Sequence, residues 1–226
     1  AEITEGRLRA GTLDIALSPV TPGDLALDAG DRARLEGASG RAAQLAQEVL
    51  GTMAAVQGAS RLIDVSRGHI DGCILAHDAN LIFAETMADI GAQVAIPTTI
   101  NAISVDRQGW QGRGVPPVFG TKASRLADAY VRMGAAPSFT CAPYQGVSVP
   151  DRGEVIGWSE SNAVIYANSV LGARTAKHPD YLDLFIAMTG RAPETGVYLD
   201  ANRVAEVVID VDAPEGADDA LWPLLG

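Results

Sequence analysis

The segment RLIDVSRGHIDGCILAHDANLIFAETMADIGAQVAIPTTIN, residues 61–101, decides the fold because it contains a strand, a helix and a second strand in succession. Residues 61–66 are predicted to be a short buried strand. Residues 80–91 follow a helical pattern that ends at Gly91, a residue type suited to closing a helix. Residues 93–98 are predicted to be the next strand. A strand, a helix and another strand in this order are typical of a parallel sheet.

The alternation continues on both sides of this segment. Ser39 is predicted to cap a helix that begins at residue 40. The side chains expected to form its buried stripe are Leu45, Val49, Met53 and Val56. The later predicted elements are helices over 121–134, 161–173 and 180–190, and strands over 137–141, 154–160 and 206–211. The chain is therefore predicted to be of the α/β class, with parallel-sheet layers and helices on both faces.

The two ends depart from this pattern. Residues 1–30 are rich in turns and are predicted to be strands and loops at the edge of the main body, which we expect to span residues 31–226. Residues 218–226, DDALWPLLG, begin an apolar helical pattern that stops almost at once. We therefore expect the main body to be an incomplete portion of a longer protein.

Composition limits the classes of partner. The chain of 226 residues has 17 basic and 28 acidic side chains and a formal net charge of −11, which argues against general nucleic-acid binding. No apolar run approaches the roughly 20 residues of a membrane helix, and the N-terminus has no apolar segment typical of a secretion signal. The expected location is the cytoplasm, with no membrane partner.

Polar side chains follow four of the predicted strands. Because the carboxyl ends of parallel strands share one edge of a sheet, where ligands bind in open α/β folds, we expect these side chains to meet there. The set comprises His69, Asp71, Cys73, Thr98, Asn101, Asp106, Arg107, Cys141, Tyr144, Glu160 and Asn162.

Several of these residues also have an ordinary structural interpretation. His69 could hydrogen-bond within a turn, and Asp71 belongs to an Asp-Gly pair that is common in turns. Glu160 could be only a favourable charge near a helix N-terminus. Arg174 could bind an anion through its guanidinium group or pair with a helix C-terminus. The short amides that could either bind a carboxylate or cap a helix are Asn101 and Asn162.

Cys73 and Cys141 are the two cysteines of the chain. Without a secretion signal, a structural disulfide is the weaker prediction. Inert core thiols, metal ligands and a reactive thiol all remain open. The two cysteines are too far apart in sequence for the close pairs of zinc ribbons.

Four segments together resemble the aconitase X family, distant relatives of aconitase: HIDGC (69–73), GAQVAIPTTINAISVDRQGW (91–110), MGAAPSFTCAPYQG (133–146) and the stretch 158–193. Their order and spacing also match, and the resemblance extends from about residue 31 to the end. It implies an aconitase-like fold, here lacking the small swivelling domain. It also implies a [2Fe–2S] or [4Fe–4S] cluster or a mononuclear iron held by three cysteines. Two of these map onto Cys73 and Cys141, and the third is expected beyond Gly226.

The resemblance further implies a hydro-lyase that removes water from a small hydroxy-carboxylate. The expected reaction converts cis-3-hydroxy-L-proline to Δ1-pyrroline-2-carboxylate, and the alternative substrate is mevalonate 5-phosphate. Iron with an open position can act as a Lewis acid on the departing hydroxyl, while a base takes the α-proton. Under this hypothesis His69 and Asp71 are catalytic. The residues expected to hold substrate are Thr98, Asn101, Glu160, Asn162 and Arg174.

Two other classes of function compete with this interpretation. One is a metal-free thiol enzyme with Cys141 as nucleophile and His69 as base, although no cation near Cys141 in the sequence would lower the pKa of its thiol. The other is a non-catalytic fragment or subunit that works only with partner chains. Because the chain has no third cysteine, we expect it to function only with the remaining C-terminal part of the protein or with a small-domain partner.

Overall fold

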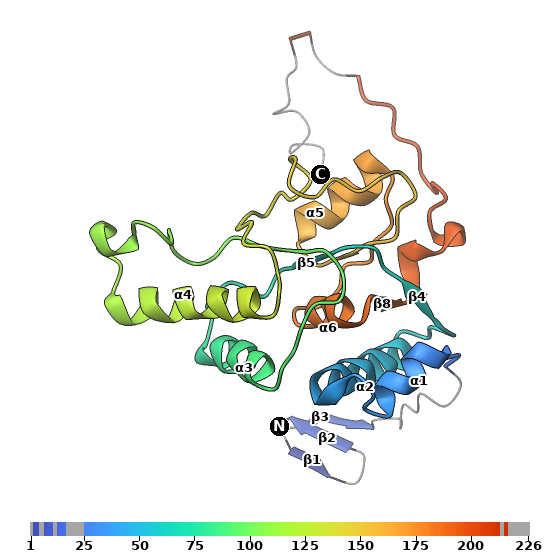
Figure 1. The fold of residues 1–226 in the computed structure, drawn as a ribbon. Helices are drawn as coiled ribbons and strands as arrows, with labels where there is room; N and C mark the ends of the chain where they lie inside the picture. The colour runs from blue at the N-terminus through green and yellow to red at the C-terminus, as the bar shows by residue number, and fades with distance from the viewer. Residues whose placement is uncertain (1, 5–6, 11–12, 17–24, 213–214, 217–226) are drawn as a thin grey trace.

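The computed structural model describes residues 2–4, 7–10, 13–16, 25–212 and 215–216 of the chain. Figure 1 shows short strands surrounded by helices, with a three-stranded meander near the N-terminus. The α-helices are α1 (Ala29–Leu35), α2 (Gly40–Val56), α3 (Asp78–Asp89), α4 (Pro117–Arg132), α5 (Ser161–Tyr166) and α6 (Leu182–Thr189). The 3-10 helices span Trp110–Arg113, Gly196–Tyr198 and Asp200–Asn202, and a π-helical turn spans Ala167–Leu171.

A parallel sheet of three short strands lies at the centre of the fold. Its order is β6 (Thr98–Ile100), β5 (Gly68–Ile70) and β7 (Gly157–Trp158). Both neighbours run parallel to β5. This arrangement confirms the α/β class. It also brings the carboxyl ends of all three strands to one edge.

Two smaller sheets lie outside the central one. Strand β4 (Leu62–Asp64) pairs antiparallel with β8 (Arg191–Pro193). The meander of β1 (Glu2–Thr4), β2 (Arg7–Ala10) and β3 (Leu13–Ala16) is antiparallel throughout and falls within the segment 1–30 that the sequence sets apart.

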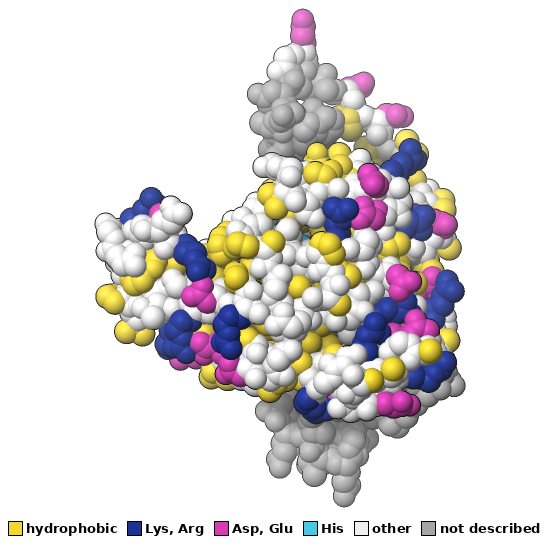
Figure 2. Space-filling model, viewed as in Figure 1, with side chains coloured by type: hydrophobic (Ala, Val, Ile, Leu, Met, Phe, Trp, Pro, Cys, Tyr) yellow, Lys and Arg dark blue, Asp and Glu magenta, His cyan; other side chains and the backbone are white. Residues whose placement is uncertain are grey.

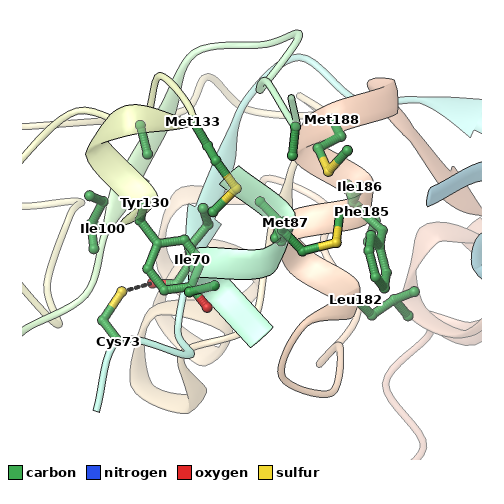
Figure 3. Packing of buried hydrophobic residues seen from close by; sticks show 14 of the residues in the cluster. Ile70, Cys73, Met87, Ile100, Tyr130, Met133, Leu182, Phe185, Ile186 and Met188 are labelled. Atoms are coloured by element: carbon green, nitrogen blue, oxygen red, sulfur yellow. Dashed lines mark hydrogen bonds between the residues drawn. The ribbon is translucent and has the colours of Figure 1, made fainter. Parts of the chain in front are cut away.

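Helix α6 is the centre of the core. Each of its eight residues is buried, including the polar Asp183 and Thr189, because α6 packs against the central sheet and against α2. Figure 3 shows how side chains from the sheet, α3, α4 and α6 meet in one apolar cluster. The residues labelled there are Ile70, Cys73, Met87, Ile100, Tyr130, Met133, Leu182, Phe185, Ile186 and Met188.

Several strand predictions are corrected by the structure. The strand predicted over 93–98 is shifted toward the C-terminus and exists as β6. The strand predicted at 61–66 exists as β4, but it pairs with β8 and not with the parallel sheet. The strand that enters the parallel sheet, β5, lies within the stretch taken for the following loop. Residues 137–141 are irregular. They contact β6 through a parallel bridge between Ala136 and Thr99 and a hydrogen bond from the backbone N–H of Thr140 to the carbonyl of Ile100.

The predicted strand over 206–211 is also wrong. Its backbone has no regular structure, and Figure 1 shows this part of the chain running away from the main body. The exposed fractions of Val207, Val208 and Ile209 are 74%, 83% and 78%. The apolar pattern that predicts a strand therefore meets no neighbouring strand among the described residues. The short helical pattern at 218–226 lies outside the described residues.

The helix predictions are confirmed, with one correction to a buried face. Gly91 and Gly134 follow α3 and α4 with φ of 85° and 93°, in the left-handed region that glycine tolerates. Ser39 occupies the N-cap position of α2, but its side chain makes no capping hydrogen bond. The fully buried stripe of α2 lies one position further along than predicted. It consists of Ala42, Ala46, Gln47, Leu50, Gly51 and Ala54.

Charged side chains of both signs alternate over the α3–α4 helix pair, as Figure 2 shows on the face that is viewed. Three ion pairs of 2.7 Å connect the two helices: Lys122–Asp78, Arg125–Glu85 and Arg132–Asp89. Exposed pairs of this kind contribute little individually, so the helices are held mainly by the apolar cluster beneath. Within the described ranges, no helix combines the length and apolar character needed to cross a bilayer.

A half-buried ionic cluster attaches α1 to the β4–β8 sheet. The guanidinium of Arg191 donates from Nε and Nη2 to the two carboxylate oxygens of Asp31, each at 3.1 Å. It also pairs with Asp28 and Asp64 and donates to the carbonyl of Leu62. The Asp31 side chain has no exposed surface. Nη1 of Arg34 lies 3.2 Å from Oδ1 of the same carboxylate, so the Asp31 charge is balanced by two guanidinium groups, of which that of Arg191 is bidentate.

We expect Arg191→Met to lower the free energy of unfolding by about 3 kcal/mol, the lower end of the range for a broken buried pair, because Asp31 loses its bidentate partner and keeps only Arg34. The matched control is Arg61→Met, which removes an exposed bidentate pair with Glu194 on the same sheet and should cost less than about 1 kcal/mol. Urea unfolding followed by circular dichroism measures both. Equal losses in the two variants would contradict the expected dependence on burial.

Candidate active site

Three polar residues occupy one row at the carboxyl edge of the parallel sheet. In the register, Ile70 is paired with Ile100, and His69 with Trp158. Asp71 and Asn101 come one residue after the first pair, and continuing the second pair by two residues places Glu160 opposite Asp71. They are therefore brought to the same level by the strands themselves.

The side chain of Asn101 joins the two carboxyl groups of this row. Its Nδ2 donates to Oδ1 of Asp71 and to Oε2 of Glu160, each at 2.5 Å. Burial raises the pKa of Glu160, and the hydrogen bond and negative charge of Asp71 raise it further, whereas Asn101 and Lys177 act in the opposite direction. Glu160 thus retains a proton to higher pH than an ordinary glutamate. A carboxyl group whose pKa is raised in this way is suited to donate a proton as a general acid.

Two residues that the sequence analysis does not include contact Asp71 in this row. The ammonium group of Lys177 lies 3.6 Å from Oδ2 of Asp71. Asp183, at the start of α6, accepts hydrogen bonds from the backbone N–H groups of Asp71 and Leu184, each at 2.7 Å. A charged residue within the apolar stretch of α6 is the sequence signal that could have identified Asp183. Lys177 has no comparable signal.

Asp183 is fully buried, and burial raises its pKa to about 7. The folded-state pKa thus exceeds the value of about 3.9 of an unfolded aspartate, so its contribution favours folding at low pH and is lost as the pH rises through 7. In the wild type, the titration of Asp183 should lower the free energy of unfolding between about pH 4 and pH 7, and Asp183→Asn should remove that part of the decline. At low pH the variant should be less stable by about 1 kcal/mol, because one acceptor oxygen is lost.

Urea titrations of the wild type and the Asp183→Asn variant at several pH values measure this effect as the difference between the two curves. Asp89→Asn is the control, since it neutralises an exposed aspartate on α3. A difference curve that stays flat from pH 4 to pH 7 would show that Asp183 does not titrate in this range.

His69 lies in the interior, one residue before the end of β5. Its Nδ1 is 2.7 Å from the hydroxyl of Thr99, and its ring is edge-on to Trp158 at 6.0 Å. Burial lowers the pKa of His69 to about 4, so the ring is neutral at neutral pH. Its Nε2 has no hydrogen-bond partner among the described residues.

The remaining predicted substrate residues make contacts within the protein. The hydroxyl of Thr98 donates to the carbonyl of Ile96 at 2.8 Å. The amide of Asn162 donates to the carbonyl of Cys141 at 2.9 Å, which attaches the cysteine loop to the start of α5. The guanidinium of Arg174 donates to the carbonyl of Tyr198 and to the carboxylate of Asp200. Arg174 therefore pairs with the end of a short 3-10 helix.

The two cysteines have different surroundings. Cys73 has no exposed surface, contacts the carbonyl of Ile70 at 3.6 Å, and lies beside Tyr130 in the apolar cluster (Figure 3). Burial, with a further contribution from Asp183, raises the pKa of its thiol well above the usual value. Cys141 is exposed. No hydrogen bond connects it to His69 within the part of the chain described by the structure, so the pair required by a thiol enzyme is not formed there.

Thiols are donors that iron centres use, but their number here is too small for a complete site. Among the described residues, no group of three His, Cys, Asp or Glu side chains is arranged to hold a metal ion. The chain therefore fits an iron centre in the kind of donor it supplies and not in the number.

Comparison with known proteins gives the same family by three routes. Residues 24–201 match the family described as the aconitase X first domain. The chain is 52% identical over 198 residues to the cis-3-hydroxy-L-proline dehydratase of Hypocrea jecorina, covering 87% of this chain and 33% of the relative. It is 54% identical over 200 residues to the protein of the same name from Pseudomonas aeruginosa, covering 88% of this chain and 34% of the relative.

More distant relatives share the same domain. The phosphomevalonate dehydratase large subunit of Methanothermobacter thermautotrophicus is 35% identical over 199 residues, covering 87% of this chain and 50% of the subunit. The crystal structure of aconitase X from Thermococcus kodakaraensis in its holo-form superposes with a TM-score of 0.77 at 34% identity, covering 84% of this chain and 47% of that one. The chain spans about a third of the length of the two hydroxyproline dehydratases that it matches. The chain belongs to the aconitase X family, whose first domain it contains.

Proposed function

We propose that the protein containing this domain is a hydro-lyase that converts cis-3-hydroxy-L-proline to Δ1-pyrroline-2-carboxylate. The observation that supports this most strongly is the row of Asp71, Asn101 and Glu160, in which one amide holds two carboxyl groups at a strand edge. Identity above 50% to two cis-3-hydroxy-L-proline dehydratases favours this substrate over mevalonate 5-phosphate, whose dehydratase relative is 35% identical.

The elimination needs a base for the α-proton and an acid for the departing hydroxyl. We assign the base to Asp71 and the acid to Glu160, whose raised pKa keeps it protonated to higher pH. Asp71 takes the proton from Cα, a double bond forms between Cα and Cβ, and the hydroxyl leaves Cβ as water with the proton of Glu160. The resulting enamine tautomerises to Δ1-pyrroline-2-carboxylate.

The other residues of the site are assigned supporting roles. Asn101 fixes the separation and orientation of the two carboxyl groups. His69 is neutral, and its hydrogen bond to the Thr99 hydroxyl stabilises the end of β5 that precedes Asp71. Asn162 is assigned to substrate binding through the Cys141 loop that it holds in place. Thr98 begins β6 and Arg174 bridges to Val155 ahead of β7, so these two are assigned structural roles toward the amino ends of the strands.

Cys73 and Cys141 are proposed as ligands of an iron–sulfur cluster or a mononuclear iron that is completed by a residue outside this chain. When bound, the iron would act as a Lewis acid on the substrate hydroxyl. The rest of the protein, whether one longer chain or a second subunit, would also supply the small domain that closes the site. The Methanothermobacter thermautotrophicus relative is named a large subunit, which supports an arrangement of two subunits.

The test is a comparison of two substrates with the full-length protein, or with the complete set of subunits, prepared without oxygen. Consumption of cis-3-hydroxy-L-proline and mevalonate 5-phosphate is followed in parallel by NMR, and iron and sulfide are determined on the same sample. We expect turnover of hydroxyproline only. Turnover of mevalonate 5-phosphate alone would replace the substrate, and iron-loaded protein inactive on both would overturn the proposed function.

A further inference from the structure

Lys177 lies in a loop that the structure holds on both sides. Thr175 accepts a hydrogen bond from the backbone N–H of Trp158 at 3.0 Å, at the end of β7. On the other side, Nε2 of the buried His178 is 2.8 Å from the hydroxyl of Tyr198. Because residues 175 and 178 are fixed to the core, the Lys177 side chain starts from a defined position beside the carboxyl edge of the sheet.

The N–H donors of the Lys177 ammonium group have no acceptor within hydrogen-bond distance among the described residues. Its contact with Asp71, at 3.6 Å, is an ion pair longer than a normal hydrogen bond. An ammonium group has three N–H donors, and none of them is satisfied by a described residue within hydrogen-bond distance. The side chain is 48% exposed, so an incoming ligand can reach it.

The charges around the row require a cation for a carboxylate substrate. As the proposed base, Asp71 is a carboxylate, and it would repel the carboxylate of a substrate if no positive group faced that substrate. The backbone of Arg174 bridges to Val155, ahead of β7 and so toward the amino end of the sheet, and its guanidinium donates to Tyr198 and Asp200. Lys177 is therefore the basic residue that an ion pair to Asp71 places at this site, among the residues that the structure describes.

We propose that Lys177 binds the carboxylate of the substrate and thereby determines specificity for small carboxylates. This inference rests on the proposed function and deepens it. In this arrangement the ammonium group lies between Asp71 and the substrate carboxylate, which directs the adjacent Cα toward the Asp71 base. Lys177 then discriminates a carboxylate from a neutral group of the same shape.

The test uses the full-length protein and two ligands that differ in this group, L-proline and L-prolinamide. Calorimetric titration gives both dissociation constants without any need for turnover. The variants are Lys177→Gln and Lys177→Arg, and the control is Lys122→Gln, which removes a similar lysine from an ion pair between α3 and α4.

We expect the wild type and the Lys122→Gln control to prefer L-proline over L-prolinamide. Lys177→Gln should weaken L-proline about 10- to 100-fold and L-prolinamide by less than about threefold, as expected for a charged hydrogen bond, and Lys177→Arg should recover part of the loss. A structural role would weaken both ligands equally, and that result, or no preference in the wild type, would overturn the inference. The protein could also show a preference for L-proline that depends on Lys177 and yet not dehydrate hydroxyproline. That result would support the carboxylate site and contradict the proposed function.

Discussion

Glu160→Gln in the full-length protein is expected to lower kcat for cis-3-hydroxy-L-proline by about 10²- to 10⁴-fold, the usual contribution of a positioned acid or base. Glutamine has nearly the same shape and keeps an oxygen that can accept the hydrogen bond from Asn101. The change therefore removes the proton to be transferred and leaves the row in place. KM should change by only a few fold, since the substrate carboxylate is bound elsewhere.

Glu154→Gln is the matched control for this prediction. Glu154 is a largely buried glutamate that pairs with Arg67 and Ser66 away from the row, and the Arg67 and Ser66 contacts help lower its pKa. Its replacement should leave kcat near that of the wild type even if it costs stability. If Glu160→Gln retains more than about a third of the wild-type kcat, Glu160 is not the acid.

Replacing either Cys73 or Cys141 by alanine should abolish iron retention in the full-length protein. Cys73 is buried among apolar side chains, so the loss of its sulfur leaves only a small void and the fold should persist. Cys141 is exposed, and its replacement removes no packing in the core. Loss of iron in a folded variant therefore reports ligation and not unfolding.

Iron and acid-labile sulfide measured on anaerobically purified protein test this prediction, with thermal unfolding to verify that each variant is folded. Asn162→Ala is a useful comparison, because it releases the Cys141 loop without removing a thiol and should keep more iron than either cysteine variant. Wild-type iron content in both cysteine variants would reject the proposed ligands.

The helices could be predicted from the sequence because their signals are local. Apolar residues recur every three or four positions, and a glycine closes α3, α4 and α6. The strands were harder to place because they are only two or three residues long, too short for an alternating pattern. Whether β4 joins the parallel sheet or pairs antiparallel with β8 depends on residues more than 120 positions apart, which no local pattern reports.

Some residues of the candidate site could likewise be predicted from the sequence, and others could not. Asp71, Asn101 and Glu160 could be grouped in advance because the carboxyl ends of parallel strands meet, even though the exact strand positions were displaced. Lys177 and Asp183 could not, since neither follows a strand of the sheet. Asp183 reaches the row because α6 begins beneath β5, and Lys177 because its loop is held between β7 and Tyr198.

Proton loss from the substrate tests the central claim most directly. The iron-loaded, full-length protein is incubated in H₂O with cis-3-hydroxy-L-proline deuterated at Cα, and the deuterium is followed by NMR as product accumulates. We predict that deuterium passes to the solvent in step with formation of Δ1-pyrroline-2-carboxylate, and that both processes slow together in Glu160→Gln. Substrate that remains deuterated and unconsumed by the iron-loaded protein would contradict the account.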